Sequence, residues 1–226
     1  MLLTIEQHCL LCKQSSEHLI CQYCIHDLAL FELKAHRYNL MLMPKVKRGL
    51  AKVDFPRVLA LTQYQWPLSR LLTGLKFSAY IPNAKALATL FVEHCMQDQK
   101  KLPQLIIPIP LHKNRYLSRK FNQSIELAKQ INKLTHIPID TSIISRTKAT
   151  QAQTNLSAAK RRKNLKNAFY VPPSSIEKLE KYQHVALFDD VITTGTTMNY
   201  AYNSLHVLQP NLRIDIWSIC ITLERQ

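Results

Sequence analysis

Residues 185–198, with the sequence VALFDDVITTGTTM, combine an apolar run, two adjacent carboxylates and a turn rich in hydroxyl groups. Val185 to Phe188 are all apolar, as expected for a parallel strand that is covered on both faces. Ala201, Leu205 and Leu208 follow with the spacing of a helix. The stretch therefore predicts a buried strand, a turn and a helix, which is the repeating unit of a parallel α/β sheet.

The turn between this strand and this helix is suited to a phosphate group. Backbone N–H groups at a helix N-terminus and the positive end of the helix dipole attract anions. Asp189 and Asp190 would repel a phosphate that they faced, so we expect them to accept hydrogen bonds from the two vicinal hydroxyls of a ribose whose 5-phosphate lies in the turn. In this hypothesis, hydroxyls for the phosphate would come from Thr193, Thr194, Thr196 and Thr197. The alternative to phosphate binding is a strand-to-helix connection with solvated acids and a threonine cap.

Glycine is scarce in this chain, which has 3 glycines in 226 residues, where average usage would give about 16. One of them, Gly195, is in the middle of the turn, and we expect its missing side chain to let a ligand oxygen approach the backbone. Neither G-x-x-x-x-G-K-[ST] nor G-x-G-x-x-G occurs in the sequence. This argues against a P-loop nucleotidase and against a Rossmann dehydrogenase.

Four cysteines near the start form two C-x2-C pairs separated by 8 residues, namely Cys9, Cys12, Cys21 and Cys24. Each pair can present two thiolates from one tight turn, and two pairs complete the tetrahedron that Zn²⁺ prefers. The pattern predicts a closed, structural zinc site. Disulfides are the competing interpretation, which a cytoplasmic location disfavours, and a thiolate could be replaced by His8, His18 or His26. Cys95 and Cys220 lie in apolar surroundings and are predicted to be core residues.

The charge balance points to a polyanionic substrate or partner, because 30 basic residues face 15 acidic ones and the formal net charge is +15. One cluster contains Lys160, Arg161, Arg162, Lys163 and Lys166, and another contains His112, Lys113, Arg115, Arg119 and Lys120. A solvated basic face that keeps the protein soluble is the alternative. Nucleic-acid surfaces interleave aromatics with cations, and the aromatic residues near cations here are Tyr64, Trp66, Tyr116 and Phe121.

No targeting or membrane segment is expected. The apolar run from Met1 to Ile5 is too short for a secretory signal, and no later stretch approaches the ~20 apolar residues of a membrane span. We therefore expect a cytoplasmic protein without membrane insertion.

Alternation of short apolar strands with helices predicts one α/β domain with a small N-terminal appendage. The expected helices are 25–33, 68–77, 83–96 and 122–134, and the expected strands, besides 185–188, are 57–64, 105–109, 143–144, 169–171 and 214–223. The proposed division is a zinc-binding module at 1–33, a basic, irregular connector at 34–52, and the α/β domain at 53–226. Residues 146–167 suit either a mobile lid or an exposed amphipathic helix.

The opening stretch resembles the phosphoribosyl pyrophosphate (PRPP) motif of type I phosphoribosyltransferases. Three further blocks extend the resemblance to the ComF/GntX family, which joins a double zinc ribbon to a phosphoribosyltransferase-like domain in competence-associated proteins. The resemblance covers nearly the whole chain in the same order. The blocks are Tyr64–Leu68 with Leu75–Phe77; Ile107–His112 with Arg115, Arg119 and Phe121–Gln123; and Arg146, Gln153, Leu156, Ser157, Arg161, Asn164, Ala168 and Phe169.

The resemblance implies a type I phosphoribosyltransferase-like parallel sheet flanked by helices, with PRPP and Mg²⁺ bound at the carboxyl ends of the strands. In such a site Asp189 and Asp190 would fix the ribose, while Lys76, Arg115, Arg119 and the loop 108–113 would hold the diphosphate. Lys76 could equally be a surface lysine, and the arginines could belong to the basic face. One departure is Lys120, where family members usually carry glycine; if this position needs a positive φ, Lys120 is strained.

Three functions fit this sequence. The first is transfer of phosphoribose from PRPP to an acceptor that the sequence does not identify. The second is a PRPP sensor without turnover. The third, implied by the resemblance, is an accessory role in DNA uptake, with single-stranded DNA or a cytoplasmic DNA-import helicase as partner.

Overall fold

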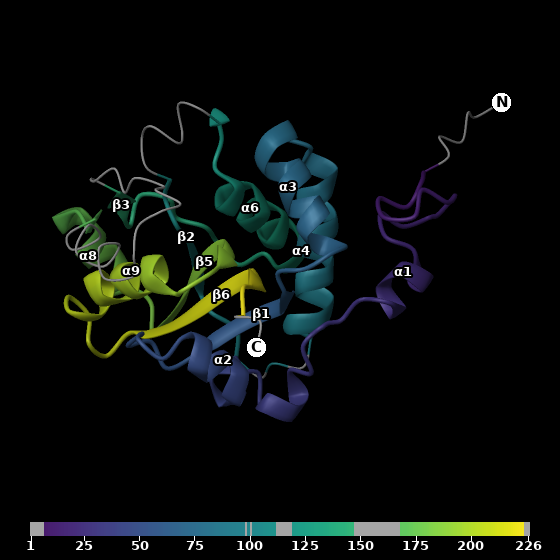
Figure 1. Ribbon diagram of the computed structural model, residues 1–226. Helices are drawn as coiled ribbons and strands as arrows, with labels where there is room; N and C mark the ends of the chain where they lie inside the picture. Colours follow the sequence, from purple (N-terminus) through teal and green to yellow (C-terminus); the bar gives the residue numbers. More distant parts are fainter. Residues whose placement is uncertain (1–6, 98, 100, 112–118, 147–167, 224–226) are drawn as a thin grey trace, which may run out of the picture.

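The computed structural model describes residues 7–97, 99, 101–111, 119–146 and 168–223 (Figure 1). Its centre is a four-stranded sheet in the order β1-β6-β5-β2, in which every neighbouring pair is parallel. The strands are β1 (Val58–Gln63), β2 (Leu105–Pro108), β5 (His184–Ile192) and β6 (Arg213–Ile221). Nearly all their side chains are buried. The predicted α/β fold with a parallel sheet is therefore confirmed.

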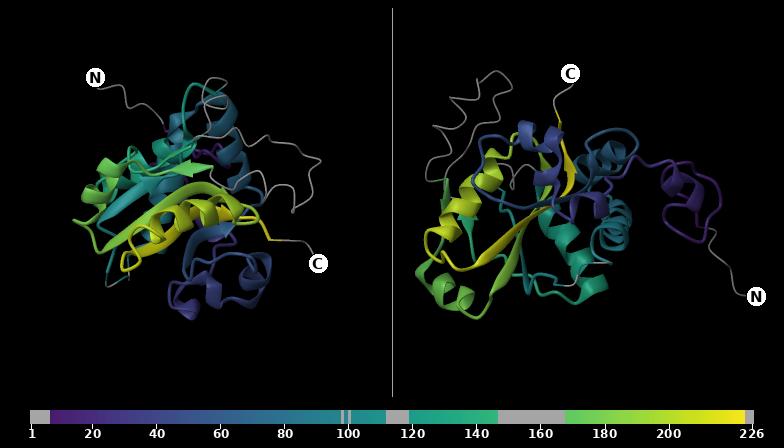
Figure 2. Two further views of the ribbon diagram at one scale, coloured as in Figure 1. Left: turned by 90° about the vertical axis from the view of Figure 1, so that its left-hand side faces the viewer. Right: turned by 90° about the horizontal axis from the view of Figure 1, so that it is seen from below.

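Helices cover both faces of this sheet. Figures 1 and 2 show α3 (Leu68–Ser78), α4 (Ile81–Cys95) and α6 (Gln123–Thr135) on one side, and α2 (Pro44–Gly49) and α9 (Thr196–His206) on the other. On the first side, the ring of Phe91 in α4 packs edge-on against Phe188 in β5, with ring centroids 6.0 Å apart. Such aromatic contacts join a helix to a central strand and add to the burial of apolar surface.

The sequence predicts α3, α4 and α6 correctly to within two residues, but the helix expected at 25–33 is wrong. The helix in this region, α1, spans Gln22–His26. Beyond it the chain is extended, and Leu30 forms an antiparallel bridge with Thr62 of β1. The Phe31 N–H also donates to the Leu61 carbonyl at 3.0 Å. These apolar residues therefore pack through pairing with a sheet edge, which helical periodicity alone does not reveal.

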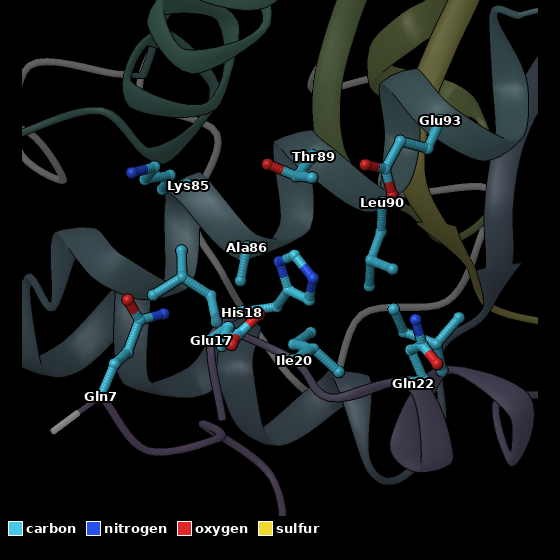
Figure 3. A pocket seen from close by; sticks show the side chains of 12 residues that line it. Gln7, Glu17, His18, Ile20, Gln22, Lys85, Ala86, Thr89, Leu90 and Glu93 are labelled. Atoms are coloured by element: carbon cyan, nitrogen blue, oxygen red, sulfur yellow. The ribbon is translucent and has the colours of Figure 1, made fainter. Parts of the chain in front are cut away.

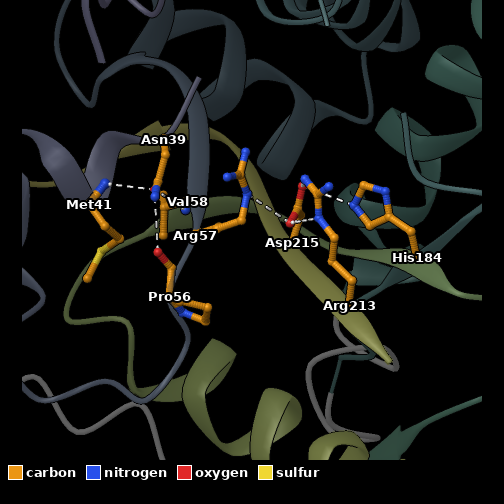
Figure 4. A network of polar contacts seen from close by, with 8 residues as sticks. All are labelled: Asn39, Met41, Pro56, Arg57, Val58, His184, Arg213 and Asp215. Carbon is orange, nitrogen blue, oxygen red and sulfur yellow. Dashed lines mark hydrogen bonds and ion pairs between the residues drawn. The ribbon is translucent and has the colours of Figure 1, made fainter. Parts of the chain in front are cut away.

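The stretch predicted as an irregular connector contains short helices: η1 (Lys34–His36), η2 (Leu40–Leu42) and α2. Leu40, Val46 and Leu50 from this stretch are buried in the core. The Asn39 side chain ties it to β1, because its Oδ1 accepts from the Val58 N–H at 3.2 Å and its Nδ2 donates to the Pro56 carbonyl at 3.1 Å (Figure 4).

Two short strands, β3 (Ser145–Arg146) and β4 (Phe169–Tyr170), form a separate antiparallel pair. The strand expected at 143–144 is therefore displaced by two residues, although Ile143 and Ile144 are buried. The helix α8 (Pro173–Leu179) was not among the expected elements. Pro173 occupies the first helical position, where the missing N–H costs no hydrogen bond.

One buried carboxylate holds together the beginnings of three strands. Asp215 in β6 accepts two hydrogen bonds from Arg213, at 3.2 and 3.0 Å, and pairs with Arg57 Nε at 3.2 Å and His184 Nε2 at 3.0 Å (Figure 4). Burial alone would raise the pKa of Asp215, but the His184 and Arg213 partners outweigh it and lower that pKa. The cluster lies at the sheet edge opposite the carboxyl ends of the strands.

Candidate functional site

The stretch 185–198 forms a strand, a turn and a helix, as predicted, but the strand is longer than expected. β5 continues to Ile192, and Asp189 and Val191 pair with Ser218 and Cys220 of β6. The acid pair thus lies inside the strand, near its carboxyl end, and the hydroxyl-rich turn follows it. Leu208 is wrongly assigned to the helix, because α9 ends at His206 and Leu208 is exposed.

Asp190 is buried and forms an ion pair with a lysine from another element. Its Oδ2 lies 2.6 Å from Nζ of Lys76 in α3, and both side chains are largely shielded from solvent. The structure therefore brings the candidate lysine to the acid pair itself, where its charge offsets that of Asp190. Its predicted contact with a diphosphate stays a prediction.

Asp189 is held by the start of α6. Its Oδ1 accepts from the Ser124 hydroxyl at 2.7 Å and from the Asp190 N–H at 2.9 Å. Burial raises the pKa of Asp189 to about 7, and the neighbouring Asp190 charge acts in the same direction, while these hydrogen bonds oppose the rise only in part. Near neutral pH Asp189 can therefore lose or gain a proton easily.

Ser124 is a site residue that the sequence reasoning missed. It belongs to the first turn of α6, which Asn122 caps: Asn122 Oδ1 accepts from the Ser124 N–H at 3.0 Å. Asn122 Nδ2 also donates to the Ile109 carbonyl at 2.9 Å, which ties the helix start to the segment after β2. The Phe121-Asn122-Gln123 block was singled out, and its capping asparagine was the available signal for a helix start at the site.

The turn after β5 places its hydroxyls in front of α9. Thr193 and Thr194 are exposed, Thr196 and Thr197 are partly buried, and the Thr194 and Thr196 hydroxyl oxygens lie 2.7 Å apart. Together with the N-terminal N–H groups of α9, these hydroxyls form a surface that an anion could approach. Binding of a 5-phosphate there remains a prediction.

The structure shows two constraints on Gly195 that the sequence did not reveal. It caps α9 with φ +72°, in the left-handed region. A Cβ at this position would lie 2.8 Å from Val53 Cγ1 and 3.0 Å from Leu50 Cδ2. The space beside Gly195 is therefore filled by Leu50 and Val53, from the segment between α2 and β1, so a glycine is required here for packing as well. Approach of a ligand oxygen to Gly195 remains a prediction.

Of the two predicted diphosphate arginines, Arg119 is described and Arg115 lies outside the described residues. The Arg119 guanidinium lies 5.6 Å from the centre of the Phe77 ring. Phe77 is the residue that follows Lys76 in α3. Lys120 has φ +60°, so the condition for strain at this departure from the family pattern is met. The other basic positions of the two clusters, 112–113 and 160–166, also lie outside the described residues. The same holds for Tyr116 and for all but Arg146 of the segment 146–167, which was predicted as a lid or an exposed helix.

The four paired cysteines converge as predicted. The sulfur atoms of Cys9, Cys12, Cys21 and Cys24 all lie within 4.8 Å of one another. A tetrahedral zinc site with Zn–S bonds of about 2.3 Å places its sulfurs about 3.8 Å apart, and the Cys12 and Cys21 sulfurs are 3.8 Å apart. The cluster can therefore hold one zinc ion with four thiolate ligands, which leaves no open coordination position.

The backbone around Cys9 favours its thiolate, whereas burial and the neighbouring cysteines raise the pKa of Cys24. Burial opposes ionisation of Cys9, but hydrogen bonds from backbone groups, including the Cys21 N–H at 3.4 Å, outweigh it and lower the pKa of Cys9 to about 6. Cys95 and Cys220, in contrast, are buried in the core as predicted, and burial raises the pKa of both thiols.

A cavity of about 420 Å³ separates the N-terminal cysteine module, residues 7–33, from α4. Figure 3 shows His18 and Ile20 from the module facing Ala86 and Leu90 of α4 across it. Its charged lining is mixed, because α4 contributes both Lys85 and Glu93 and the module contributes Glu17. It therefore lacks the excess of cations that a polyanion would need.

Among the described residues, each helix is too short or too polar to span a bilayer.

Comparison with known proteins identifies relatives for most of the chain. No protein-family model matches it. Competence protein F of Haemophilus influenzae is 37% identical over 170 residues, which cover 74% of this chain and 73% of that protein. DNA utilization protein YhgH of Escherichia coli O157:H7 is 35% identical over 176 residues with the same coverage, and YhgH of Salmonella typhimurium is 30% identical across 98% of this chain and 100% of its own length. The chain therefore belongs to the competence protein F (ComF) family.

Proposed function

We propose that this chain is a PRPP-binding, phosphoribosyltransferase-like protein that acts in competence and in the use of incoming DNA. The observation that carries the proposal is the acid pair near the carboxyl end of β5, followed by a hydroxyl-rich turn at the N-terminus of α9. In parallel α/β sheets, ligands bind at this edge. The names of the relatives, competence protein F and DNA utilization protein, support the cellular role.

In this proposal each part of PRPP has its own partners. The ribose hydroxyls donate to Asp189 and Asp190, and the 5-phosphate lies among the threonines of the turn. The diphosphate faces Lys76 and Arg119, and Arg115 joins them from outside the described residues. Ser124 holds the Asp189 carboxylate and Lys76 holds the Asp190 carboxylate. Because both carboxylates are fixed in position, they favour binding of a ribose in one orientation.

Carboxylate oxygens suit Mg²⁺, so the donor set of the acid pair fits this ion. Lys76 already offsets the charge of Asp190, however, so we expect Mg²⁺ to bind together with the diphosphate. When bound, Mg²⁺ would neutralise charge on the departing diphosphate. The residues of this chain would fix the sugar and keep the leaving group facing Lys76, Arg115 and Arg119.

Transfer and sensing differ in one measurable event. In transfer, the bond from the anomeric carbon to the diphosphate oxygen breaks, a bond from that carbon to the acceptor forms, and free diphosphate leaves. A sensor binds PRPP and releases it unchanged. A diphosphate-release assay with candidate acceptors therefore separates the two functions once binding is established.

The proposal is tested by calorimetry with PRPP and Mg²⁺. Asp189→Ala and Asp190→Ala each remove acceptors for ribose hydroxyls and should cost ~1.5–3 kcal/mol, weakening PRPP by roughly one to two decades. Asn variants, which keep an acceptor, should lie between Ala and the parent. Glu177→Ala, which removes an exposed carboxylate from α8, is the matched control and should bind like the parent. Parental affinity in both Ala variants would refute the proposal.

A further inference from the structure

Two polar side chains at the start of α6 are almost fully buried. Asn122 is 4% exposed and Ser124 is 1% exposed. A polar group that leaves water destabilises the fold unless it is hydrogen-bonded, so the partners of these two side chains are informative. Asn122 bonds to the segment after β2, and Ser124 bonds to the acid pair. At this burial neither side chain is available to a ligand, so any effect on binding must pass through these partners.

Asn122 joins the two ends of the segment between β2 and α6. Its Nδ2 donates at 2.9 Å to the carbonyl of Ile109, the first residue after β2. The Ile109 N–H donates in turn to the Phe188 carbonyl of β5 at 2.8 Å. Ile109 is therefore fixed on both sides, to the start of α6 and to the residue that precedes Asp189.

The start of α6 also reaches Asp189 by a second path. Asn122 Oδ1 accepts from the Ser124 N–H at 3.0 Å, and the Ser124 hydroxyl donates to Asp189 Oδ1 at 2.7 Å. Because Phe188 and Asp189 are adjacent in β5, these hydrogen bonds close a ring through β2, α6 and β5. In such a network each bond constrains the others, so the three elements hold one another in place.

This ring lies between the two halves of the candidate site. Asp189 belongs to the ribose half. Arg119, the described arginine of the diphosphate half, is three positions before Asn122 in the chain. Its guanidinium lies over the ring of Phe77, the residue after Lys76 in α3. A force that a diphosphate exerts on Arg119 would therefore reach the acid pair through Asn122.

We propose that Asn122 and Ser124 are positioning residues that couple the diphosphate half of the site to its ribose half. A diphosphate that fixes Arg119 fixes the ring, and the ring then holds Asp189 where the ribose hydroxyls need it. Ordering one half in advance lowers the cost of binding at the other, so the two halves of the ligand bind more tightly together than apart. This inference rests on the proposed function, because it joins the two subsites assigned there.

Separate ligand fragments measure this coupling directly. Calorimetry on the full-length, zinc-loaded protein uses inorganic diphosphate with Mg²⁺ for one half. For the other half it uses the ribose 5-phosphate analogue that lacks the anomeric hydroxyl, which leaves room for a diphosphate oxygen. In the parent, saturating diphosphate should tighten binding of the sugar phosphate by roughly 5- to 150-fold, and the sugar phosphate should tighten diphosphate binding by the same factor.

Asn122→Ser tests the link between the helix start and β2. Serine still caps α6 but lacks the amide that bonds Ile109. Each fragment alone should bind as in the parent, while the coupling should fall to a factor of about 1. Asn39→Ser is the matched control, because Asn39 caps η2 and donates to the Pro56 carbonyl at 3.1 Å, beside the start of β1. It should lower the urea midpoint to a similar extent and keep the coupling.

Ser124→Ala tests the link to the acid pair. It removes the hydroxyl that bonds Asp189 but keeps the helix cap, which uses the Ser124 N–H. Binding of the sugar phosphate alone should weaken by roughly 5- to 10-fold, diphosphate alone should bind as in the parent, and the coupling should be lost. Ser175→Ala is the control, because Ser175 is also 1% exposed and its hydroxyl donates to the Ser142 carbonyl, away from the acid pair. This control should keep the coupling.

The outcomes separate this inference from the function on which it rests. If neither PRPP nor either fragment binds the parent, the proposed function is wrong and the coupling is wrong with it. If both fragments bind the parent independently, or if the coupling survives in Asn122→Ser and Ser124→Ala, only the positioning role is wrong. Loss of the coupling in Asn39→Ser as well would assign the effect to a general loosening of the fold and would overturn the role of Asn122.

Discussion

Replacement of Gly195 by alanine tests how the turn between β5 and α9 is built. Alanine brings two penalties to this position. The first is the left-handed backbone at φ +72°, and the second is the approach of its Cβ to 2.8 Å from Val53 Cγ1 and 3.0 Å from Leu50 Cδ2. Both neighbours belong to the segment that joins α2 to β1, so the variant should loosen the contact between that segment and α9.

The size of the effect follows from these two penalties. A left-handed conformation costs a residue with a side chain about 1–2 kcal/mol, and overpacking in a filled space costs typically about 1–3 kcal/mol. Reduced freedom of alanine in the unfolded chain returns roughly 0.4–1 kcal/mol. The free energy of unfolding of Gly195→Ala should therefore be about 2–4 kcal/mol lower than that of the parent, which a domain of ordinary stability survives.

A double-mutant cycle in urea separates the two penalties. Val53→Ala removes the nearest atom, so in that background Gly195→Ala should cost about 1–2 kcal/mol less, while the backbone penalty persists. The four proteins are compared by their midpoints and slopes in urea. If the two substitutions are additive within roughly 0.5 kcal/mol, Val53 does not crowd this position and the reasoning is refuted.

Three further predictions concern the metal, the acid pair and the strained loop. Purified protein should contain about one zinc per chain by metal analysis; Cys12→Ser should lose it and Cys95→Ala should keep it, and a zinc-free parent with four reduced thiols would exclude the site. Burial raises the folded-state pKa of Asp189 to about 7. The stability that the protonated Asp189 contributes is therefore fully present below the unfolded-state pKa near 4 and is lost as the pH rises through about 7. The free energy of unfolding of Asp189→Asn, measured in urea, should therefore rise relative to the parent by up to about 4 kcal/mol across that range, whereas a constant difference would contradict the raised pKa. Lys120→Gly should stabilise the protein by about 0.5–1 kcal/mol because φ is +60° there, and thermal unfolding should show no such gain for Lys120→Ala, which keeps the strain.

The sheet was predictable because its strands are apolar runs with helical segments between them. The end of β5 was not, because its pairing with β6 continues through Asp189 and Asp190, after the apolar run stops at Phe188. Backbone hydrogen bonds define the strand, whereas the apolar pattern only reports which side chains are covered. At the carboxyl end of β5 the two diverge, since polar side chains there remain in strand geometry.

The partners of the acid pair could be predicted only in part. Lys76 was singled out by resemblance, and the structure places it on Asp190. Ser124 lies 65 positions from Asp189 in the chain, and no local pattern links the two. The packing constraint on Gly195 was also hidden, because the atoms that fill the space beside it come from Leu50 and Val53, which are more than 140 positions away in the chain.

The position of β6 has a consequence for the order of folding. β6 lies between β1 and β5, and its residue Ile216 pairs with Val58 on one side and Leu187 on the other. Both neighbouring strands, β1 and β5, precede β6 in the chain. During synthesis, the edges of β1 and β5 that pair with β6 therefore remain unpaired until the segment Arg213–Ile221 emerges. Pairing of such distant segments is slow, and open edges invite association between chains. We therefore expect β6 to complete the nascent sheet, so that chains stopped before Arg213 aggregate instead of folding.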